Sequence, residues 1–141
     1  EGHHYQFLPV MDDELFAVLP KGHPLEEYDA IPMKKFSGAP FVTTEYAPGS
    51  DIYRILKEFQ LKPDIRFLSI NEFSVLSMVE HGLGITILPG LLLRGHSGNF
   101  VKRRLEPRSF RRLGLGYSSY DDLSPASRIF LEYAKSFLLD D

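Results

Sequence analysis

The sequence predicts an α/β fold, with a mixed, mainly parallel sheet flanked by helices. Strand patterns and amphipathic helix patterns alternate along most of the chain, the order typical of such a sheet. The clearest strand, residues 85–88, is apolar or β-branched throughout, as expected where helices cover both faces. It follows a helix pattern that stops at Gly82, a residue suited to the left-handed conformation that ends a helix.

Three more strands are predicted before that segment. Each is a short run rich in apolar or β-branched residues. They cover residues 14–19, 41–44 and 65–70. The turn-rich residues 20–24 end the first strand.

Two helices are predicted among these strands. The first begins near Ser50, because apolar residues recur at i, i+3, i+4 and i+7 from Ile52. The second follows capping-box spacing from Ser69 to Glu72. Its predicted apolar stripe is Phe73, Leu76 and Val79.

The last third of the chain is predicted to hold a short helix at 91–93, a loop at 95–99 and two strands at 100–105 and 113–118. A final helix starts at Ser124-Pro125, a cap followed by proline at the first helical position. Its predicted apolar face is Ala126, Ile129, Phe130, Tyr133 and Phe137.

Composition favours one globular domain in a reducing compartment. The 141 residues are 43% hydrophobic and 25% charged, and they include no cysteine, which excludes disulfides and thiol chemistry. The net charge of −3 gives no general attraction to nucleic acid or membrane. No apolar run approaches the roughly 20 residues of a spanning helix, and the polar start lacks a secretion signal. A cytoplasmic protein without membrane contact is therefore expected.

Two segments carry a family resemblance. Residues 13–25 (DELFAVLPKGHPL) and 79–89 (VEHGLGITILP) resemble, in this order, the effector-binding domain of LysR-type transcriptional regulators. The resemblance implies a periplasmic-binding-protein-like (type 2) fold of two lobes, with the effector in the cleft between them. It implies that residues 13–115 form the second lobe. Residues 1–12 would cross from the first lobe, and residues 116–141 would be its return strand and C-terminal helix.

The resemblance also implies partners and missing parts. A winged helix-turn-helix, a linker helix and the first half of lobe one would precede Glu1, so the chain would be a fragment. DNA would be bound only by that missing domain, and a homodimer or tetramer is expected. The implied function is ligand sensing, with a small-molecule effector and no cofactor.

Two strand-to-helix junctions, residues 43–51 and 69–73, supply the candidate site. In a parallel sheet both junctions fall at one edge, so two helix N-termini converge there. Helix N-termini favour a bound anion, but three nearby carboxylates, those of Glu45, Asp51 and Glu72, would repel one. They either cap the helices or select an effector with an amine, so the expected ligand is a small polar metabolite. The candidate effector-binding residues are Thr43, Thr44, Glu45, Gly49, Ser50, Asp51, Ser69, Asn71, Glu72 and Phe73.

A purely structural role is the alternative for several of these residues. Ser50, Asp51, Ser69 and Asn71 are also ordinary helix-cap residues. For Phe73 the alternative is a position in the hydrophobic core, and the sequence favours that alternative.

A basic segment within residues 102–112 has two interpretations. It could contact phosphates, or it could be a solvated hairpin whose basic side chains lie on an exposed face or pair with acids across an interface. The negative net charge favours the hairpin. The basic residues are Lys102, Arg103, Arg104, Arg108, Arg111 and Arg112.

No catalytic or metal site is predicted. The segments 95–99 and 116–120 lack the last glycine of a G-x-S-x-G motif, and no glycine pair here has the third glycine of a dinucleotide loop. The histidines lack metal-ligand spacing. Two other hypotheses remain: a fragment of a periplasmic-type solute-binding protein, and a small α/β enzyme.

Overall fold

The computed structural model describes residues 5–44 and 47–139, and side chains as far as residue 137. The chain divides into two compact units. Asp13–Arg111 form one unit, and Glu1–Asp12 with Arg112–Asp141 form the other. The division into lobes implied by the resemblance stays a prediction.

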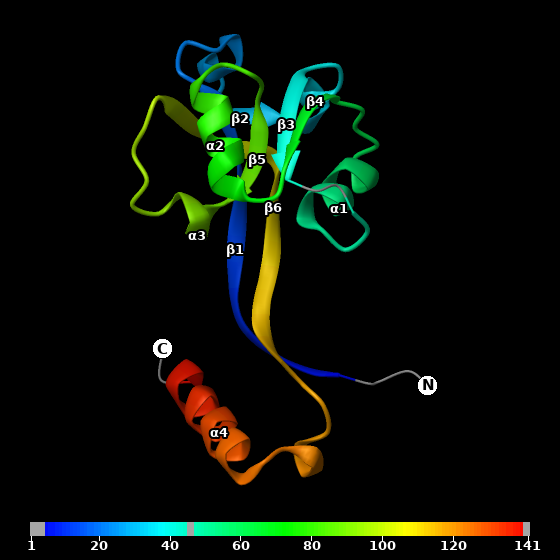
Figure 1. The fold of residues 1–141 in the computed structure, drawn as a ribbon, viewed down its shortest axis with the longest axis vertical. Helices are drawn as coiled ribbons and strands as arrows, with labels where there is room; N and C mark the ends of the chain where they lie inside the picture. The colour runs from blue at the N-terminus through cyan, green and yellow to red at the C-terminus, as the bar shows by residue number, and fades with distance from the viewer. Residues whose placement is uncertain (1–4, 45–46, 140–141) are drawn as a thin grey trace. The chain divides into compact units, whose positions relative to one another are not determined.

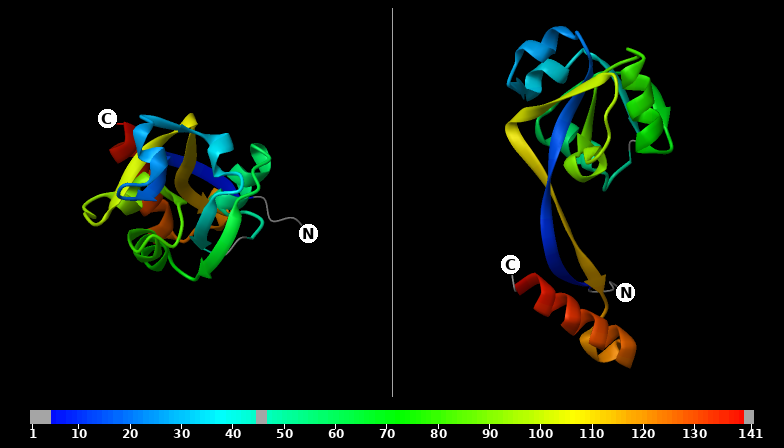
Figure 2. Two further views of the ribbon diagram at one scale, coloured as in Figure 1. Left: turned by 90° about the horizontal axis from the view of Figure 1, so that it is seen from above. Right: turned by 90° about the vertical axis from the view of Figure 1, so that its left-hand side faces the viewer.

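Strands and helices follow in the order shown in Figures 1 and 2. The strands are β1 (Gln6–Pro20), β2 (Ala30–Pro32), β3 (Pro40–Thr44), β4 (Asp64–Ser69), β5 (Thr86–Pro89) and β6 (Phe100–Tyr117). The α-helices are α1 (Asp51–Glu58), α2 (Glu72–Glu80), α3 (Gly90–Leu93) and α4 (Pro125–Leu139). Three 3₁₀ helices, η1 (Pro24–Glu27), η2 (Met33–Phe36) and η3 (Tyr120–Asp122), complete the order.

The strands form a mixed sheet system. One sheet has the order β2-β6-β1-β5, and β3 pairs with β4 in a second. The pairs β2–β6 and β3–β4 are parallel, whereas β1–β5 is antiparallel. An isolated parallel bridge joins Phe41 of β3 to Ile85, the residue just before β5. The predicted α/β class with a mixed sheet flanked by helices is confirmed.

Two hydrophobic clusters lie on opposite faces of these strands, because successive strand residues point to opposite sides. Phe41 belongs to the cluster that α1 covers, and the next residue, Val42, belongs to the cluster that α2 covers. Ile87 and Leu88 on β5 alternate in the same way. Helices therefore cover both faces of the strands within Asp13–Arg111 (Figure 1).

Two glycines shape the entry into β5. Gly82 has a φ of +74° and follows the C-cap of α2, which confirms the predicted glycine stop. A Cβ on Gly84 would lie 2.9 Å from the Pro40 carbonyl oxygen. Only glycine therefore lets β5 approach β3 this closely without displacing backbone.

Helix α1 begins as predicted. The Ser50 Oγ accepts a hydrogen bond from the Tyr53 backbone N–H at 3.2 Å. Ile52, Ile55 and Leu56 are buried against the sheet.

Helix α2 differs from the prediction in its cap and in its buried face. Its N-cap is Asn71, whose Oδ1 accepts from the Ser74 N–H at 2.8 Å, and not Ser69. The buried residues are Val75, Leu76 and Val79, whereas Phe73 is 56% exposed. Phe73 precedes Val75 by two residues, about 200° around the helix, so it points away from the core. The prediction of a core position for Phe73 is therefore wrong.

The predicted strands at 100–105 and 113–118 are one continuous strand, β6. It is hydrogen-bonded to β2 on one side and β1 on the other. Arginines in the intervening segment pair with acids on β1, so the charged residues 106–112 stay within the ladder. The two-strand prediction and the predicted basic hairpin are wrong for this reason.

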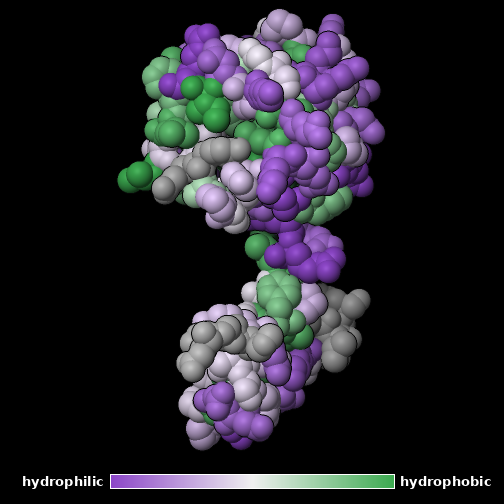
Figure 3. Space-filling view, turned by 90° about the vertical axis from the view of Figure 1, so that its right-hand side faces the viewer, coloured by the Kyte–Doolittle hydropathy of each residue, from purple (hydrophilic) through white to green (hydrophobic). Residues whose placement is uncertain are grey.

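Strand β4 is apolar but exposed. Ile65, Phe67 and Leu68 are 37%, 45% and 60% exposed, and Ile70 after the strand is 97% exposed. Figure 3 shows hydrophobic side chains gathered on part of the surface of Asp13–Arg111. In the described residues β4 is the edge of a two-stranded sheet, which leaves its outer side without a neighbouring strand.

Helix α4 starts at the predicted cap, where the Ser124 Oγ accepts from the Ser127 N–H at 3.1 Å. Its predicted apolar face is exposed, with Ile129 and Tyr133 each 72% accessible. Leu131 is buried. None of the helices within the described ranges is long and apolar enough to cross a membrane.

We predict that acid destabilises the fold through His23. Its Nδ1 accepts the Leu25 N–H at 3.1 Å, which requires an unprotonated nitrogen, and burial lowers the pKa of His23. Below pH 6.5 the unfolded chain therefore binds more protons than the fold at this residue, and stability falls as the pH falls. In thermal unfolding at successive pH values, His23→Asn should lose much of the decline in Tm.

The exposed His81 supplies the control. His81→Asn removes a histidine outside η1 and should keep the wild-type decline. Equal pH profiles for His23→Asn and the wild type would contradict the prediction.

Candidate functional site

The carboxyl ends of β3 and β4 meet at one edge. In their parallel register Thr44 lies opposite Ser69. Each strand leads to a helix, and the N-caps of those helices are Ser50 and Asn71. The register confirms the predicted convergence of the two strand-to-helix junctions.

A pocket of about 240 Å³ lies at this edge, within Asp13–Arg111. Its polar wall comes from the end of β3, the start of α1, the start of α2 and β6. Its apolar wall comes from β1, α1 and the end of β5. The polar wall comprises Thr44, Gly49, Ser50, Asp51, Glu72 and Arg111, and the apolar wall comprises Leu15, Ile52, Ile87, Leu88 and Pro89.

The pocket gathers half of the predicted site. Of the ten candidates, Thr44, Gly49, Ser50, Asp51 and Glu72 line it.

The other candidates lie elsewhere. Thr43 is buried in β3, and Ser69, Asn71 and Phe73 surround the start of α2 without lining the pocket. Asn71 caps α2, and the Phe73 ring lies 5.2 Å from the His96 ring, centroid to centroid. Glu45 falls outside the described residues.

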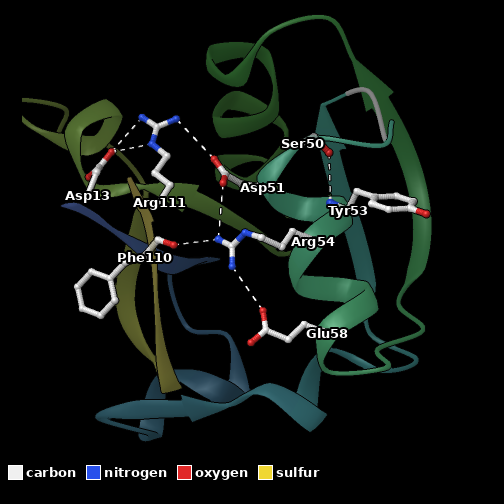
Figure 4. Close-up of polar contacts among 8 residues, drawn as sticks. All are labelled: Asp13, Ser50, Asp51, Tyr53, Arg54, Glu58, Phe110 and Arg111. Atoms are coloured by element: carbon white, nitrogen blue, oxygen red, sulfur yellow. Dashed lines mark hydrogen bonds and ion pairs between the residues drawn. The ribbon is translucent and has the colours of Figure 1, made fainter. Parts of the chain in front are cut away.

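Arg111 is the charged residue of the pocket that was not among the ten candidates. Its Nε and Nη2 lie 3.0 and 2.9 Å from Asp13 Oδ2, and its Nη1 lies 3.7 Å from Asp51 Oδ2 (Figure 4). In the sequence Arg111 belongs to the basic segment, and its partner Asp13 is 98 residues away, beyond the reach of any local pattern. The matching signal was the Asp12-Asp13 pair just before the predicted strand 14–19 and the Arg111-Arg112 pair just before the predicted strand 113–118.

Asp13 holds this guanidinium in place. It is only 4% exposed, and its Oδ1 accepts the Leu91 N–H at 2.9 Å. Both carboxylate oxygens therefore have partners, as a buried charge requires. Arg111 is fixed at the pocket wall before any ligand arrives.

The ion pairs continue into α1. Arg54 lies 3.6 Å from Asp51 and 3.4 Å from Glu58, and it donates to the Phe110 carbonyl at 2.9 Å (Figure 4). Asp51 thus lies between two arginines, on β6 and α1.

Most of the basic segment pairs with acids of the same chain, although the segment is not the predicted hairpin. Arg108 makes two 2.8 Å hydrogen bonds to Glu14, and these lower the pKa of the Glu14 carboxyl. The other pairs are Arg103–Glu26, Arg111–Asp13 and Arg112–Asp12. Within the described ranges, no group of three or more His, Cys, Asp or Glu residues could hold a metal ion.

Comparison with known proteins agrees with this architecture. Residues 1–138 match the model of the LysR substrate binding domain. The chain is 28% identical over 135 residues to the uncharacterized HTH-type transcriptional regulator YvbU of Bacillus subtilis, covering 92% of this chain and 45% of YvbU. It is 29% identical over 101 residues to the Hca operon transcriptional activator HcaR of Escherichia coli, covering 69% of this chain and 34% of HcaR.

Solved structures share the fold. The regulatory domain of Synechocystis PCC6803 CcmR in complex with 2-PG has a TM-score of 0.84 at 17% identity, covering 98% of this chain and 69% of that one. The effector binding domain of QuiR in complex with shikimate has a TM-score of 0.79 at 24% identity, covering 96% and 66%.

The chain spans less than half the length of the curated relatives named above. The family that its relatives represent consists of transcriptional regulators, not enzymes. The sheet with helices on both faces, the pocket at the β3 and β4 ends and the match over residues 1–138 lead to one conclusion: the chain belongs to the LysR substrate-binding-domain family, the effector-binding domain of LysR-type transcriptional regulators.

Proposed function

We propose that this chain senses a small polar metabolite at the pocket where β3 and β4 end. The observation that carries the proposal is the pocket itself, in which polar residues from both predicted junctions face an apolar wall. Ligand sites in α/β proteins occur at the carboxyl ends of strands, where loops with polar side chains converge.

The size of the pocket supports a small ligand. Its volume of about 240 Å³ is below the roughly 300–1,000 Å³ of sites for drug-sized molecules. The regulatory domains of CcmR and QuiR, which share the fold, are in complex with 2-PG and shikimate. A metabolite of that order of size suits this pocket.

The regulatory part of the proposal concerns the whole protein. DNA would be bound by a domain outside this chain, in a cytoplasmic homodimer or tetramer. Ligand binding would shift the population of two conformations, through its different affinity for each. Residues 13–115 would form the second lobe, and residues 1–12 and 116–141 would belong to the first. No catalytic step or cofactor is involved, and the family match favours this role over a solute-binding protein or a small enzyme.

A metabolite screen with a matched pair of cap variants tests the pocket. We expect Ser50→Ala to abolish the rise in Tm that a hit from a panel of small polar metabolites causes, because Ser50 lines the pocket. Losing the cap should also cost about 1 kcal/mol of stability without ligand.

Ser124→Ala is the control, since it removes an equivalent N-cap hydroxyl outside the pocket. It should lower the stability of the free chain by a similar amount and keep the ligand-induced rise in Tm. A panel without any hit, or a hit that Ser50→Ala leaves unchanged, would contradict the proposal.

A further inference from the structure

We infer that the pocket binds a small zwitterion of the α-amino-acid type, with its ammonium group at Glu72 and its carboxylate at Arg111. The inference rests on the proposed function, because it names the ligand class of the same pocket. Four features of the pocket support it: an acid without a partner among the described residues, a guanidinium with more donors than its described contacts use, the balance of charge and an apolar wall.

Glu72 is the acid. It lines the pocket from the first turn of α2 and is half-buried. No hydrogen bond or ion pair of Glu72 exists within the part of the chain that the structure describes. A ligand that enters the pocket removes water from this carboxylate, which is costly unless the ligand supplies a cation or donor. An ammonium group supplies both.

Arg111 is the guanidinium. Its Nε and Nη2 face Asp13, whereas its Nη1 is 3.7 Å from Asp51, beyond hydrogen-bond length. A guanidinium carries more N–H donors than these contacts use. Buried Asp13 keeps the group in a fixed position, so a ligand carboxylate meets donors that are already oriented.

The balance of charge favours a ligand with both signs. The charged side chains of the wall are Asp51, Glu72 and Arg111, and Asp51 also lies 3.6 Å from Arg54. A purely anionic ligand would leave Glu72 without a partner and would be repelled by it. A purely cationic ligand would leave the free donors of Arg111 unused. A zwitterion satisfies both groups and leaves the net charge of the pocket unchanged.

The remaining wall suits the rest of an amino acid. Hydroxyls such as those of Thr44 and Ser50 can donate to a carboxylate or accept from an ammonium group. Leu15, Ile52 and Ile87 give an apolar surface for a short aliphatic side chain.

Matched ligand pairs test the inference. The ¹⁵N-labelled 141-residue chain is titrated with L-alanine and L-valine, and with L-lactate and L-2-hydroxyisovalerate, which carry a hydroxyl in place of the amine. Amide signals of residues 50, 51 and 72 should shift with the amino acids. Their Kd should be lower than that of the hydroxy acids by about tenfold or more, a difference expected for one charge-assisted contact.

Glu72→Gln is the decisive variant. It keeps the shape of the side chain, and because Glu72 has no described partner, folding should be unaffected. It should weaken amino-acid binding about tenfold and remove the preference over the hydroxy acids. Glu27→Gln makes the same charge change at an exposed acid outside the pocket and should leave the affinity unchanged.

Two results overturn the inference and distinguish it from the proposed function. If the hydroxy acids bind as tightly as the amino acids at residues 50, 51 and 72, the zwitterion is wrong and the pocket remains the metabolite site. If amide shifts for every ligand map to other residues, the pocket and the zwitterion both fail.

Discussion

Replacing Arg111 by leucine should lower the free energy of unfolding by about 3–5 kcal/mol, the cost of leaving a buried charge without its partner. Asp13 is 4% exposed, and Arg111 supplies the contacts to its Oδ2 at 2.9 and 3.0 Å. The remaining hydrogen bond, from the Leu91 N–H to Asp13 Oδ1, is too weak to offset the cost of an unpaired buried carboxylate. Urea denaturation with coincident fluorescence and circular dichroism transitions measures the loss.

Two further variants separate the charge effect from lost packing. Adding Asp13→Asn to Arg111→Leu removes the unpaired charge and keeps an acceptor for Leu91, so it should recover part of the stability. Arg112→Leu breaks the neighbouring pair with Asp12, whose side chains are 66% and 51% exposed, and should cost about 1 kcal/mol or less. Equal losses for Arg111→Leu and Arg112→Leu would contradict the prediction.

Phe41→Ala should cost about 3–5 kcal/mol, because it opens a cavity in the centre of the larger cluster. The Phe41 ring is fully buried and packs edge-on against Phe36, with 6.1 Å between ring centroids. Its backbone also pairs with β4 and with Ile85, so neighbouring strands restrict collapse around the cavity. The same urea experiment measures the effect.

Phe67→Ala is the matched control on the adjacent strand. Phe67 lies in β4 opposite Val42 and is 45% exposed. Its removal should cost about 1 kcal/mol or less. A Phe41→Ala loss close to that of Phe67→Ala would mean that the cluster can repack around the smaller side chain.

Local patterns in the sequence predicted much of this fold. The Ser50 cap, the Gly82 stop and the covered strand after it depend on short-range hydrogen bonding and on the conformational range of single residues. The edge where β3 and β4 end followed from these elements, because parallel strands bring their helix starts together.

Pairing between strands far apart in the sequence determines the features that local patterns did not predict. Strand β6 runs through a charged segment because acids of β1 lie beside it, and no local pattern records that proximity. The same pairing brings Arg111 to the pocket. The apolar residues of β4 looked suited to a core, but burial depends on what covers a strand, and Phe67 and Leu68 are exposed.

The ion pair between Asp13 and Arg111 has a consequence for protein engineering. These two residues are the first and last of a compact unit, and their contact brings both ends of that segment to one place. A segment whose ends meet can be inserted or exchanged at a single point of a host chain without stretching the host backbone. Asp13–Arg111 could therefore be transplanted as a cassette, carrying its pocket with it.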